Sequence, residues 1–166
     1  VSSGEDGLIH VWDALTLPHP LISYQTPQRR SIRAVQWSPD GKVIACLEDG
    51  RRVHLFHVAT GMLLWSHIHG TDAALGDANE PDEETTCIGD LAFSSDGNLL
   101  ASVGDNGVPW LWDVATGTHI GSLHSAEDVR TLAFHPSRST GPHGLSHLAT
   151  GSRQGTIQIW PVYPRT

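Results

Sequence analysis

Residues 98–117 read NLLASVGDNGVPWLWDVATG, which predicts two strands joined by a tight turn. Leu99 to Val103 is a run of small and apolar residues, and Val108 to Asp113 is a second extended run. The turn between them ends in Gly107, a residue type that adopts positive φ at little steric cost and so joins antiparallel strands. We therefore expect a β-hairpin here, closed by a further turn at 115–117.

The hairpin pattern recurs at three other places in the chain. In every copy a turn glycine is followed five or six residues later by an aromatic residue, at Trp12, Phe56, Trp112 and Trp160. A second motif, an alternating strand that ends in a turn, lies between these hairpins and begins at Ile32, Ile88 and Val129. Because two motifs keep their order through every copy, we predict a repeat of small β-sheets that cover each other's apolar faces.

On these residues the chain resembles the WD40 repeat family, in which each repeat builds a four-stranded blade of a β-propeller with strands a to d from the centre outward. The resemblance implies an all-β propeller fragment of about three and a half blades, whereas closed rings have about four to eight. The expected units are a partial blade at 1–25, blades at 31–70 and 87–125, a last blade at 129–163 that lacks its outer strand, and an acidic insertion at 71–86.

In this family a turn Asp, a His before strand a and the strand-c Trp share a hydrogen-bonded network within each blade. The positions that the resemblance marks as structural are Asp6, Trp12, Asp13, Asp49, Phe56, Asn106, Trp112, Asp113 and Trp160. Several depart from the pattern, and no His stands at the expected place before strand a of either complete blade; His124 is the nearest match, before the last one. We therefore expect blade interiors that are held mainly by apolar contacts. Trp65 and Trp110 fall outside the repeat positions.

The formal net charge of −8 is concentrated in the insertion at 71–86, which contains Asp82, Glu83 and Glu84 and has no Lys or Arg. Arginines occupy the b–c turns, the d–a junctions and the start of strand a: Arg29, Arg30, Arg33, Arg51, Arg52, Arg130 and Arg153. Propeller connectivity places these segments on one face, so they could bind a partner, with acidic residues for a basic peptide and arginines for carboxylates or phosphates. The alternative is a solvated insertion and ordinary surface ion pairs.

Other kinds of site have little support in the sequence. No motif of a hydrolase, metalloprotease or phosphate-binding loop occurs, and the eleven His residues lack the spacing of zinc ligands, so we expect no catalytic, metal or cofactor site. An acidic chain without a basic stripe disfavours nucleic acid, and no apolar run is long enough to span a membrane. Cys46 and Cys87 are expected to be reduced core residues, which favours an intracellular, cytoplasmic location.

The function that follows is a scaffold that binds a peptide or protein domain through its loops and performs no catalysis. Two alternatives stay open: a half-propeller that completes a ring as a homodimer, and a regulatory or sensor propeller appended to an upstream catalytic or signalling domain. In either case the remaining blades would come from upstream or from a second copy. An enzyme with a site in the central channel would have to use Arg33, Asp90 and Arg130, which the innermost strands offer.

Overall fold

The computed structural model describes residues 1–13, 15, 18–69, 89–136 and 146–162, and it confirms the all-β fold class. No helix occurs in these ranges, so the described chain has no helix that could cross a membrane. Fourteen strands form four antiparallel sheets. The sheets are β1 (Ser2–Ser3), β2 (Leu8–Val11) and β3 (Ile22–Gln25); β4 (Ile32–Trp37), β5 (Val43–Glu48), β6 (Arg52–His57) and β7 (Leu63–Ile68); β8 (Asp90–Phe93), β9 (Leu99–Val103), β10 (Trp110–Asp113) and β11 (His119–Ser122); and β12 (Val129–Phe134), β13 (Ser146–Ser152) and β14 (Ile157–Val162).

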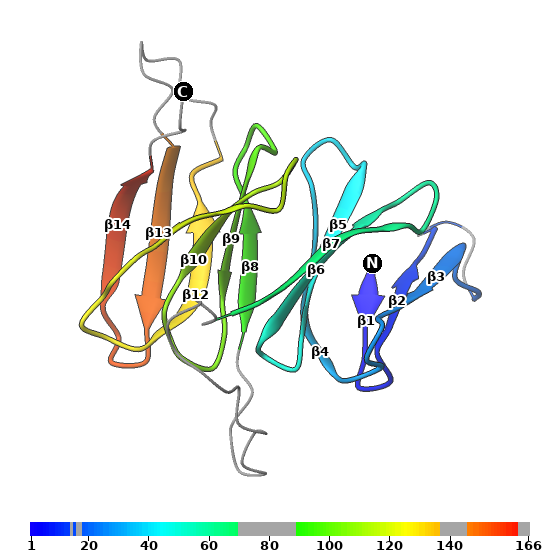
Figure 1. The fold of residues 1–166 in the computed structure, drawn as a ribbon, viewed down its shortest axis with the longest axis horizontal. Coiled ribbons are helices and arrows are strands. Elements are labelled where there is room, and N and C mark those ends of the chain that lie inside the picture. Colours follow the sequence, from blue (N-terminus) through cyan, green and yellow to red (C-terminus); the bar gives the residue numbers. More distant parts are fainter. Residues whose placement is uncertain (14, 16–17, 70–88, 137–145, 163–166) are drawn as a thin grey trace.

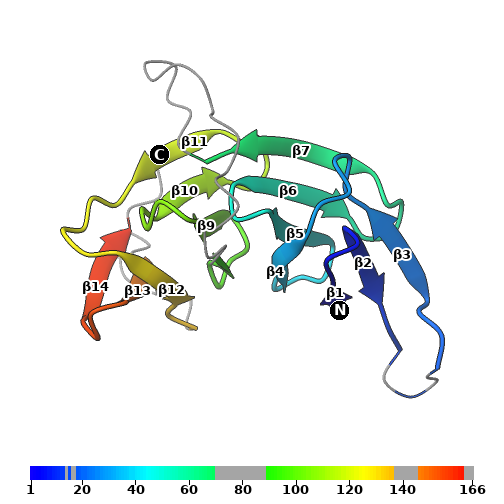
Figure 2. The same ribbon diagram turned by 90° about the horizontal axis from the view of Figure 1, so that it is seen from below.

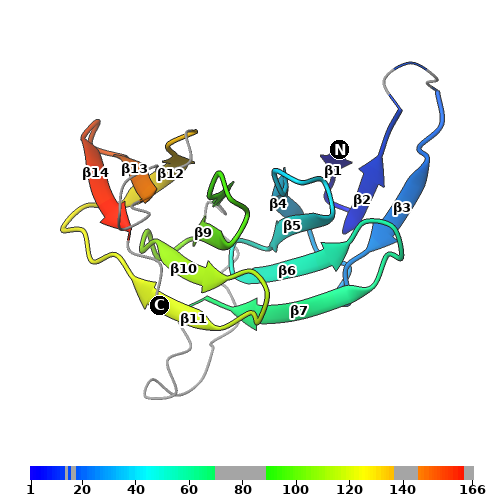
Figure 3. The ribbon, with the colours of Figure 1, turned by 90° about the horizontal axis from the view of Figure 1, so that it is seen from above.

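Each sheet is a meander in which strands pair with their neighbours in chain order. The sheets stand side by side in an arc, with β3, β7 and β11 on the outside and β4 and β12 toward the inside (Figures 1, 2 and 3). The inner strands β1, β4, β8 and β12 contact one another in succession. These sheets therefore have the arrangement of propeller blades, in an arc that does not close.

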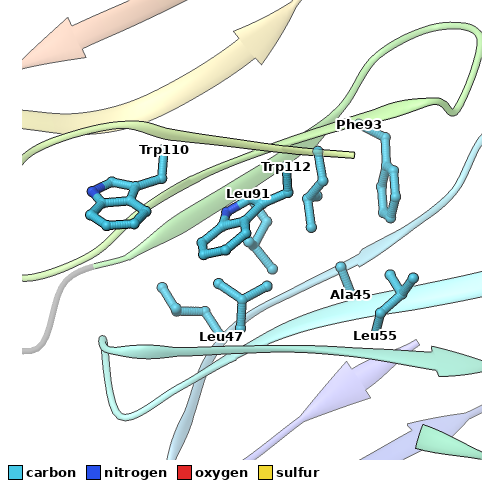
Figure 4. Packing of buried hydrophobic residues seen from close by; sticks show 9 residues of the cluster. Ala45, Leu47, Leu55, Leu91, Phe93, Trp110 and Trp112 are labelled. Carbon is cyan, nitrogen blue, oxygen red and sulfur yellow. The ribbon is translucent and has the colours of Figure 1, made fainter. Parts of the chain in front are cut away.

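The hydrophobic core is divided among the junctions between neighbouring sheets. The central junction packs Leu47 and Leu55 from the second sheet against Leu91, Trp110 and Trp112 from the third (Figure 4). Two further clusters fill the junctions on either side of it. Because burying one such side chain stabilises a fold by about 1.5–3 kcal/mol, each blade depends on its neighbours for much of its stability.

The hairpin at 98–117 forms as predicted, with one difference. The first strand, β9, covers Leu99–Val103, but the second strand begins at Trp110 rather than at 108. Pro109 lies just before this strand, where its missing N–H is not needed for the ladder, and its carbonyl accepts a bond from the Leu123 amide at 2.9 Å.

Polar clamps join the outer strand of one blade to the turn between the two outer strands of the next. Trp65 on β7 donates its indole N–H to the carbonyl of Val114, 3.0 Å away, and the Tyr24 hydroxyl on β3 donates to the carbonyl of Val58. Val58 and Val114 each stand two residues after the repeated aromatic position. At both junctions the acceptor is therefore the carbonyl at the same repeat position, whereas the donor side chain differs.

One end of the arc leaves an apolar sheet face uncovered. On β14, Ile157 is 76% exposed and Ile159 is 69% exposed. At the same repeat positions on β6, Val53 and Leu55 are fully buried because the third sheet packs against them. The open face of β14 thus has the composition of an inter-blade junction.

Candidate protein-interaction face

The turns β5–β6, β9–β10 and β13–β14 and the connections β3–β4 and β11–β12 lie at one end of the sheets; together they are called the loop face here. Backbone hydrogen bonds tie its parts across the blades. The amide of Asp105 donates to the carbonyl of Gly50 at 3.2 Å, and the amide of Val129 at the start of β12 donates to the carbonyl of Gly107 at 3.1 Å. The loop face is therefore continuous across neighbouring sheets.

Two of the predicted arginines on this face are held in ion pairs. Arg30 contacts Asp49 at 2.9 Å, and Arg130 contacts Asp128. The Arg30 pair is largely exposed, so it contributes little more than about 0–1 kcal/mol. These two arginines are thus partly committed to contacts within the chain.

Four other arginines have no ion pair in the part of the chain that the structure describes: Arg29, Arg33, Arg52 and Arg153. Arg29, Arg33 and Arg153 are exposed, and Arg52 is half-buried at the start of β6. Arg51, in the β5–β6 turn, accepts the His69 amide on its carbonyl at 2.6 Å. The face accordingly carries several cations whose charge is not neutralised locally by a described carboxylate.

Irregular pairing marks two of these arginines on the inner strands. The register of β4 with β5 shifts between Ile32 and Ala34, and that of β12 with β13 shifts between Val129 and Thr131. The residue inside each shift is Arg33 or Arg130. A β-bulge of this kind leaves one residue outside the ladder and re-aims its side chain, so both arginines stand apart from the regular strand pattern. The predicted acidic residues Asp82, Glu83 and Glu84 lie outside the described residues.

Below the loop face, a buried carboxylate fixes the β3–β4 connection. Glu48 is 1% exposed, and its Oε1 accepts the Thr26 hydroxyl and the Arg30 amide, the latter at 3.0 Å. Its Oε2 lies 2.9 Å from Nε2 of His54, which is fully buried. Burial lowers the pKa of His54 despite the Glu48 carboxylate, so we assign a neutral ring that donates from Nε2. Three donors thus satisfy the buried charge.

A second network lies between the second and third blades. Trp112 donates its indole N–H to the Ser102 hydroxyl at 2.6 Å, and the same oxygen is 2.6 Å from Nε2 of His69. We assign the hydroxyl as the donor to His69, which places the ring proton on Nδ1. Burial and, to a smaller extent, the electrostatic influence of His119 lower the pKa of His69 to about 4. The ring is therefore neutral at physiological pH.

His69 corrects the expectation that neither complete blade has its His. The residue stands at the end of β7, before the insertion, so its distance along the chain from β8 hides its role. His124, the nearest match before the last blade, is exposed and lies 3.5 Å from the Ser122 hydroxyl instead of joining such a network. An insertion between this His and strand a is compatible with the network because the bond forms across blades.

The expectation that apolar contacts alone hold the blade interiors is also incomplete. The Trp12 indole donates to Ser2 at 2.8 Å and the Trp160 indole donates to Thr150 at 3.0 Å, in the same way that Trp112 donates to Ser102. The second blade has Phe56 at this position, and Cys46, which pairs in register with His54, stands where the other blades have the hydroxyl residue. Sequence could have revealed this pairing, because a hydroxyl accompanies each Trp and the thiol accompanies the Phe.

The other repeat positions cap turns. Asp6 accepts the Leu8 amide at 3.0 Å, and Asn106 accepts the Val108 amide at 3.1 Å. The two Asp residues that follow the repeated Trp act likewise: Asp13 accepts the Leu15 amide at 2.9 Å, and Asp113 accepts the Thr116 amide at 2.8 Å. These side chains satisfy local backbone donors, as Asp and Asn commonly do in turns.

The other titratable side chains considered for a metal or catalytic site make structural contacts where the structure describes them. Within the described ranges no group of three or more His, Cys, Asp or Glu side chains could hold a metal ion. Cys46 is a buried free thiol, and burial together with Glu48 raises its pKa; Cys87 lies outside the described residues. On the inner strands, Asp90 accepts the Leu132 amide at 2.9 Å and the Thr131 hydroxyl at 2.8 Å, so its carboxylate joins the third blade to the fourth.

Comparison with known proteins agrees with this architecture. The family model "WD domain, G-beta repeat" matches residues 19–56, 81–113 and 117–161, more than half of the chain. The small ribosomal subunit protein RACK1 of Glycine max is 43% identical over 75 residues, which cover 45% of this chain and 21% of that protein. The probable cytosolic iron-sulfur protein assembly protein 1 of Mycosarcoma maydis is 30% identical over 122 residues, covering 61% and 27% respectively.

A longer but more distant match extends over almost the whole chain. The actin-interacting protein 1 of Drosophila melanogaster is 23% identical over 201 residues, which cover 99% of this chain and 32% of that protein. The chain thus spans a third or less of the length of these relatives. With the repeated sheets, the strand-c aromatic residues and the family-model matches taken together, the chain belongs to the WD40 (G-beta) repeat family.

Proposed function

We propose that this chain is a protein-interaction module that binds an acidic segment of a partner protein on its loop face and performs no catalysis. The observation that carries the proposal is the set of arginines without a described ion pair: Arg29, Arg33, Arg52 and Arg153. Guanidinium groups present planar donor pairs that match carboxylates and phosphates. The name of one relative, actin-interacting protein 1, supports a protein-binding role.

The partner is proposed to be a protein rather than a nucleic acid or a membrane. A formal net charge of −8 repels a phosphate backbone at long range, whereas a short acidic segment can still meet a local group of arginines. The site is proposed to lie in an intracellular, cytoplasmic protein. A buried free thiol at Cys46 and a relative whose name includes "cytosolic" support that location.

Binding of a labelled acidic peptide tests the loop-face proposal. Fluorescein-labelled hexaglutamate is titrated with the protein, with labelled hexalysine as the reversed-charge probe, and anisotropy is measured at two salt concentrations. Replacing Arg33 and Arg52 with Ala should weaken hexaglutamate binding about three- to tenfold, because each removes a partly screened charge contact. Lys42→Ala is the matched control, since Lys42 pairs with Asp40 in the β4–β5 turn at the other end of the sheets. Equal affinity of the double variant and the wild type would refute the proposal.

A second proposal concerns the open face of β14. We infer that a further WD40 blade, supplied by a second copy of this chain, packs on Ile157 and Ile159. Their exposure contrasts with the complete burial of Val53 and Leu55 at the same repeat positions. Light scattering after size exclusion should show a dimer that Ile157→Lys with Ile159→Lys converts to a monomer. A wild-type protein that stays monomeric at all concentrations would contradict this assembly.

A further inference from the structure

A second groove lies on the outer rim of the arc, away from the loop face. It has a volume of about 390 Å³ and lies between β3 of the first blade and residues 58–61, the turn between β6 and β7 of the second blade. Figures 2 and 3 show this turn reaching β3 from the neighbouring sheet. A volume of this size is within the range of pockets that hold ligands.

The floor of the groove is fixed by the clamp between the two blades. The buried Tyr24 ring donates its hydroxyl to the Val58 carbonyl and stacks on Phe56 with ring centroids 6.1 Å apart. A Cβ atom added to Gly61 would lie 3.0 Å from the Tyr24 ring, and Gly61 has a φ of 68°. The turn therefore rests on Tyr24 and cannot move inward to close the groove.

One wall of the groove is an unpaired strand edge. In its sheet β3 pairs with β2 on one side, and the order β1-β2-β3 gives it no described neighbour on the other. The Thr26 amide donates to the Gly7 carbonyl at 3.0 Å, which continues the ladder toward β2. Backbone groups alternate in direction along an antiparallel strand, so the N–H groups of Ser23 and Gln25 point to the open edge.

The groove carries no charge, and its lining mixes polar side chains with aliphatic ones. Every residue that lines it is neutral, from Ile22 to Gln25 and from Val58 to Gly61. Ile22 is 39% exposed, and the adjoining Leu21 and Met62 are 62% and 63% exposed. A charged segment would lose hydration here without gaining a partner, whereas an apolar segment would cover exposed aliphatic side chains.

The corresponding junction of the next blade shows why this groove stays open. There the space between β7 and residues 117–119 is only about 210 Å³, and aromatic rings line it. His67 stacks on Trp112 at 5.5 Å, and His119 lies 4.0 Å from Trp110. At the first junction Tyr24 alone forms the floor, so a larger space remains beside an open strand edge.

We propose that this groove binds an extended, uncharged segment of a partner protein that carries aliphatic and hydroxyl side chains, and that this segment adds a strand to β3. The backbone of the segment pairs with Ser23 and Gln25, and alternate side chains enter the groove, as in other cases of β-strand addition. This surface is separate from the loop face and does not depend on the function proposed for it.

The test uses an acetylated and amidated eight-residue peptide of alternating Val and Thr, with a peptide of alternating Lys and Glu as the charged control. Nitrogen-15 NMR spectra of the protein are recorded during titration with each peptide. The Val-Thr peptide should shift the amide signals of Ser23, Gln25 and Thr60, and the Lys-Glu peptide should leave them unchanged. Absence of these shifts, or equal shifts with both peptides, would overturn the proposal.

Two variants separate pairing at the edge from other effects. Gln25→Pro removes an outward N–H while leaving the ladder to β2, and Ile22→Glu places a charge in the groove. Each should reduce peptide affinity at least tenfold. Ser122→Pro on β11 is the matched control. Ser122 precedes Leu123, whose amide donates to the carbonyl of Pro109, just as Gln25 precedes Thr26, whose amide donates to the carbonyl of Gly7. Loss of binding in Ser122→Pro, or concentration-dependent shifts of the β3 amides without peptide, would refute the proposal, the latter in favour of a second copy.

Discussion

Replacing Gly117 with Ala tests the idea that the blades are held together by close contact at the β10–β11 turn. Gly117 has a φ of 71°, and a Cβ atom there would lie 2.7 Å from Cγ of Trp65. Gly41 has the same φ of 71° with nothing within 4 Å of the added Cβ. The two substitutions therefore share the backbone strain and differ in the contacts of the added Cβ, which at Gly117 are with Trp65 and, at 3.0 Å, with Nε2 of His67.

The expected loss of stability follows from these two terms. Strain of an Ala in the left-handed region costs about 1–2 kcal/mol and applies to both Gly41→Ala and Gly117→Ala. Overpacking adds about 1–3 kcal/mol for Gly117→Ala alone, because the Trp65 ring is also tied to the Val114 carbonyl at 3.0 Å. Gly117→Ala should thus lower the free energy of unfolding by about 2–5 kcal/mol, and Gly41→Ala by about 1–2 kcal/mol.

Urea unfolding followed by tryptophan fluorescence measures both changes, provided that the slope with urea stays constant. A double-mutant cycle adds the decisive comparison. In a Trp65→Ala background only the contact with Nε2 of His67 at 3.0 Å remains, so the excess cost of Gly117→Ala over Gly41→Ala should become smaller. Equal destabilisation by the two glycine substitutions in the wild-type background would refute the reasoning, as would an unchanged difference in the Trp65→Ala background.

Three further changes test other contacts. Trp65→Phe should lower the free energy of unfolding in urea by about 1 kcal/mol or more, because the Val114 carbonyl loses its indole donor. No change would mean that this hydrogen bond does not contribute to stability. Ser102→Ala should cost about 1–3 kcal/mol by the same measurement, since it leaves the buried Trp112 indole without its acceptor, and Ser122→Ala on the outer strand serves as the control. The pKa of His69 is lowered to about 4, so the unfolded chain takes up a proton that the native chain does not as pH falls from about 6.5 to 4. Stability should therefore decrease over that window by up to ~3 kcal/mol, and thermal unfolding of His69→Gln should show a flatter acid dependence; an unchanged slope would contradict the assignment.

The repeating elements of the fold could be predicted because each is fixed by local chemistry. The turn glycine and the aromatic residues at Trp12, Phe56, Trp112 and Trp160 recur in order, and each hairpin forms from adjacent residues. Stacking of the sheets followed from the apolar character of both faces. Within the hairpin at 98–117 the start of β10 was misplaced, because strand propensity extends across Pro109 while its backbone lacks a donor.

The contacts between blades could not be predicted in the same way. His69 bonds to Ser102 from a distance of 33 residues along the chain, so no local spacing marks it. Trp65 lies outside the repeat positions, and its role became apparent only from the direction of its indole N–H toward Val114. The arginines of the loop face were located by topology, but pairing of Arg30 with Asp49 depends on side-chain direction, which sequence does not specify.

Because of His69, the stretch of chain that a blade needs for its contacts does not begin where its sheet begins. The residue belongs by sequence to the last strand of the second sheet, yet it completes the polar network of the third. A transplant of β8–β11 cut at the sheet edges would leave Ser102 and Trp112 without this imidazole. Grafting, deletion or recombination of such repeats is therefore expected to succeed when the junction falls upstream of His69. The unit that is moved then contains the end of the preceding repeat together with its own sheet.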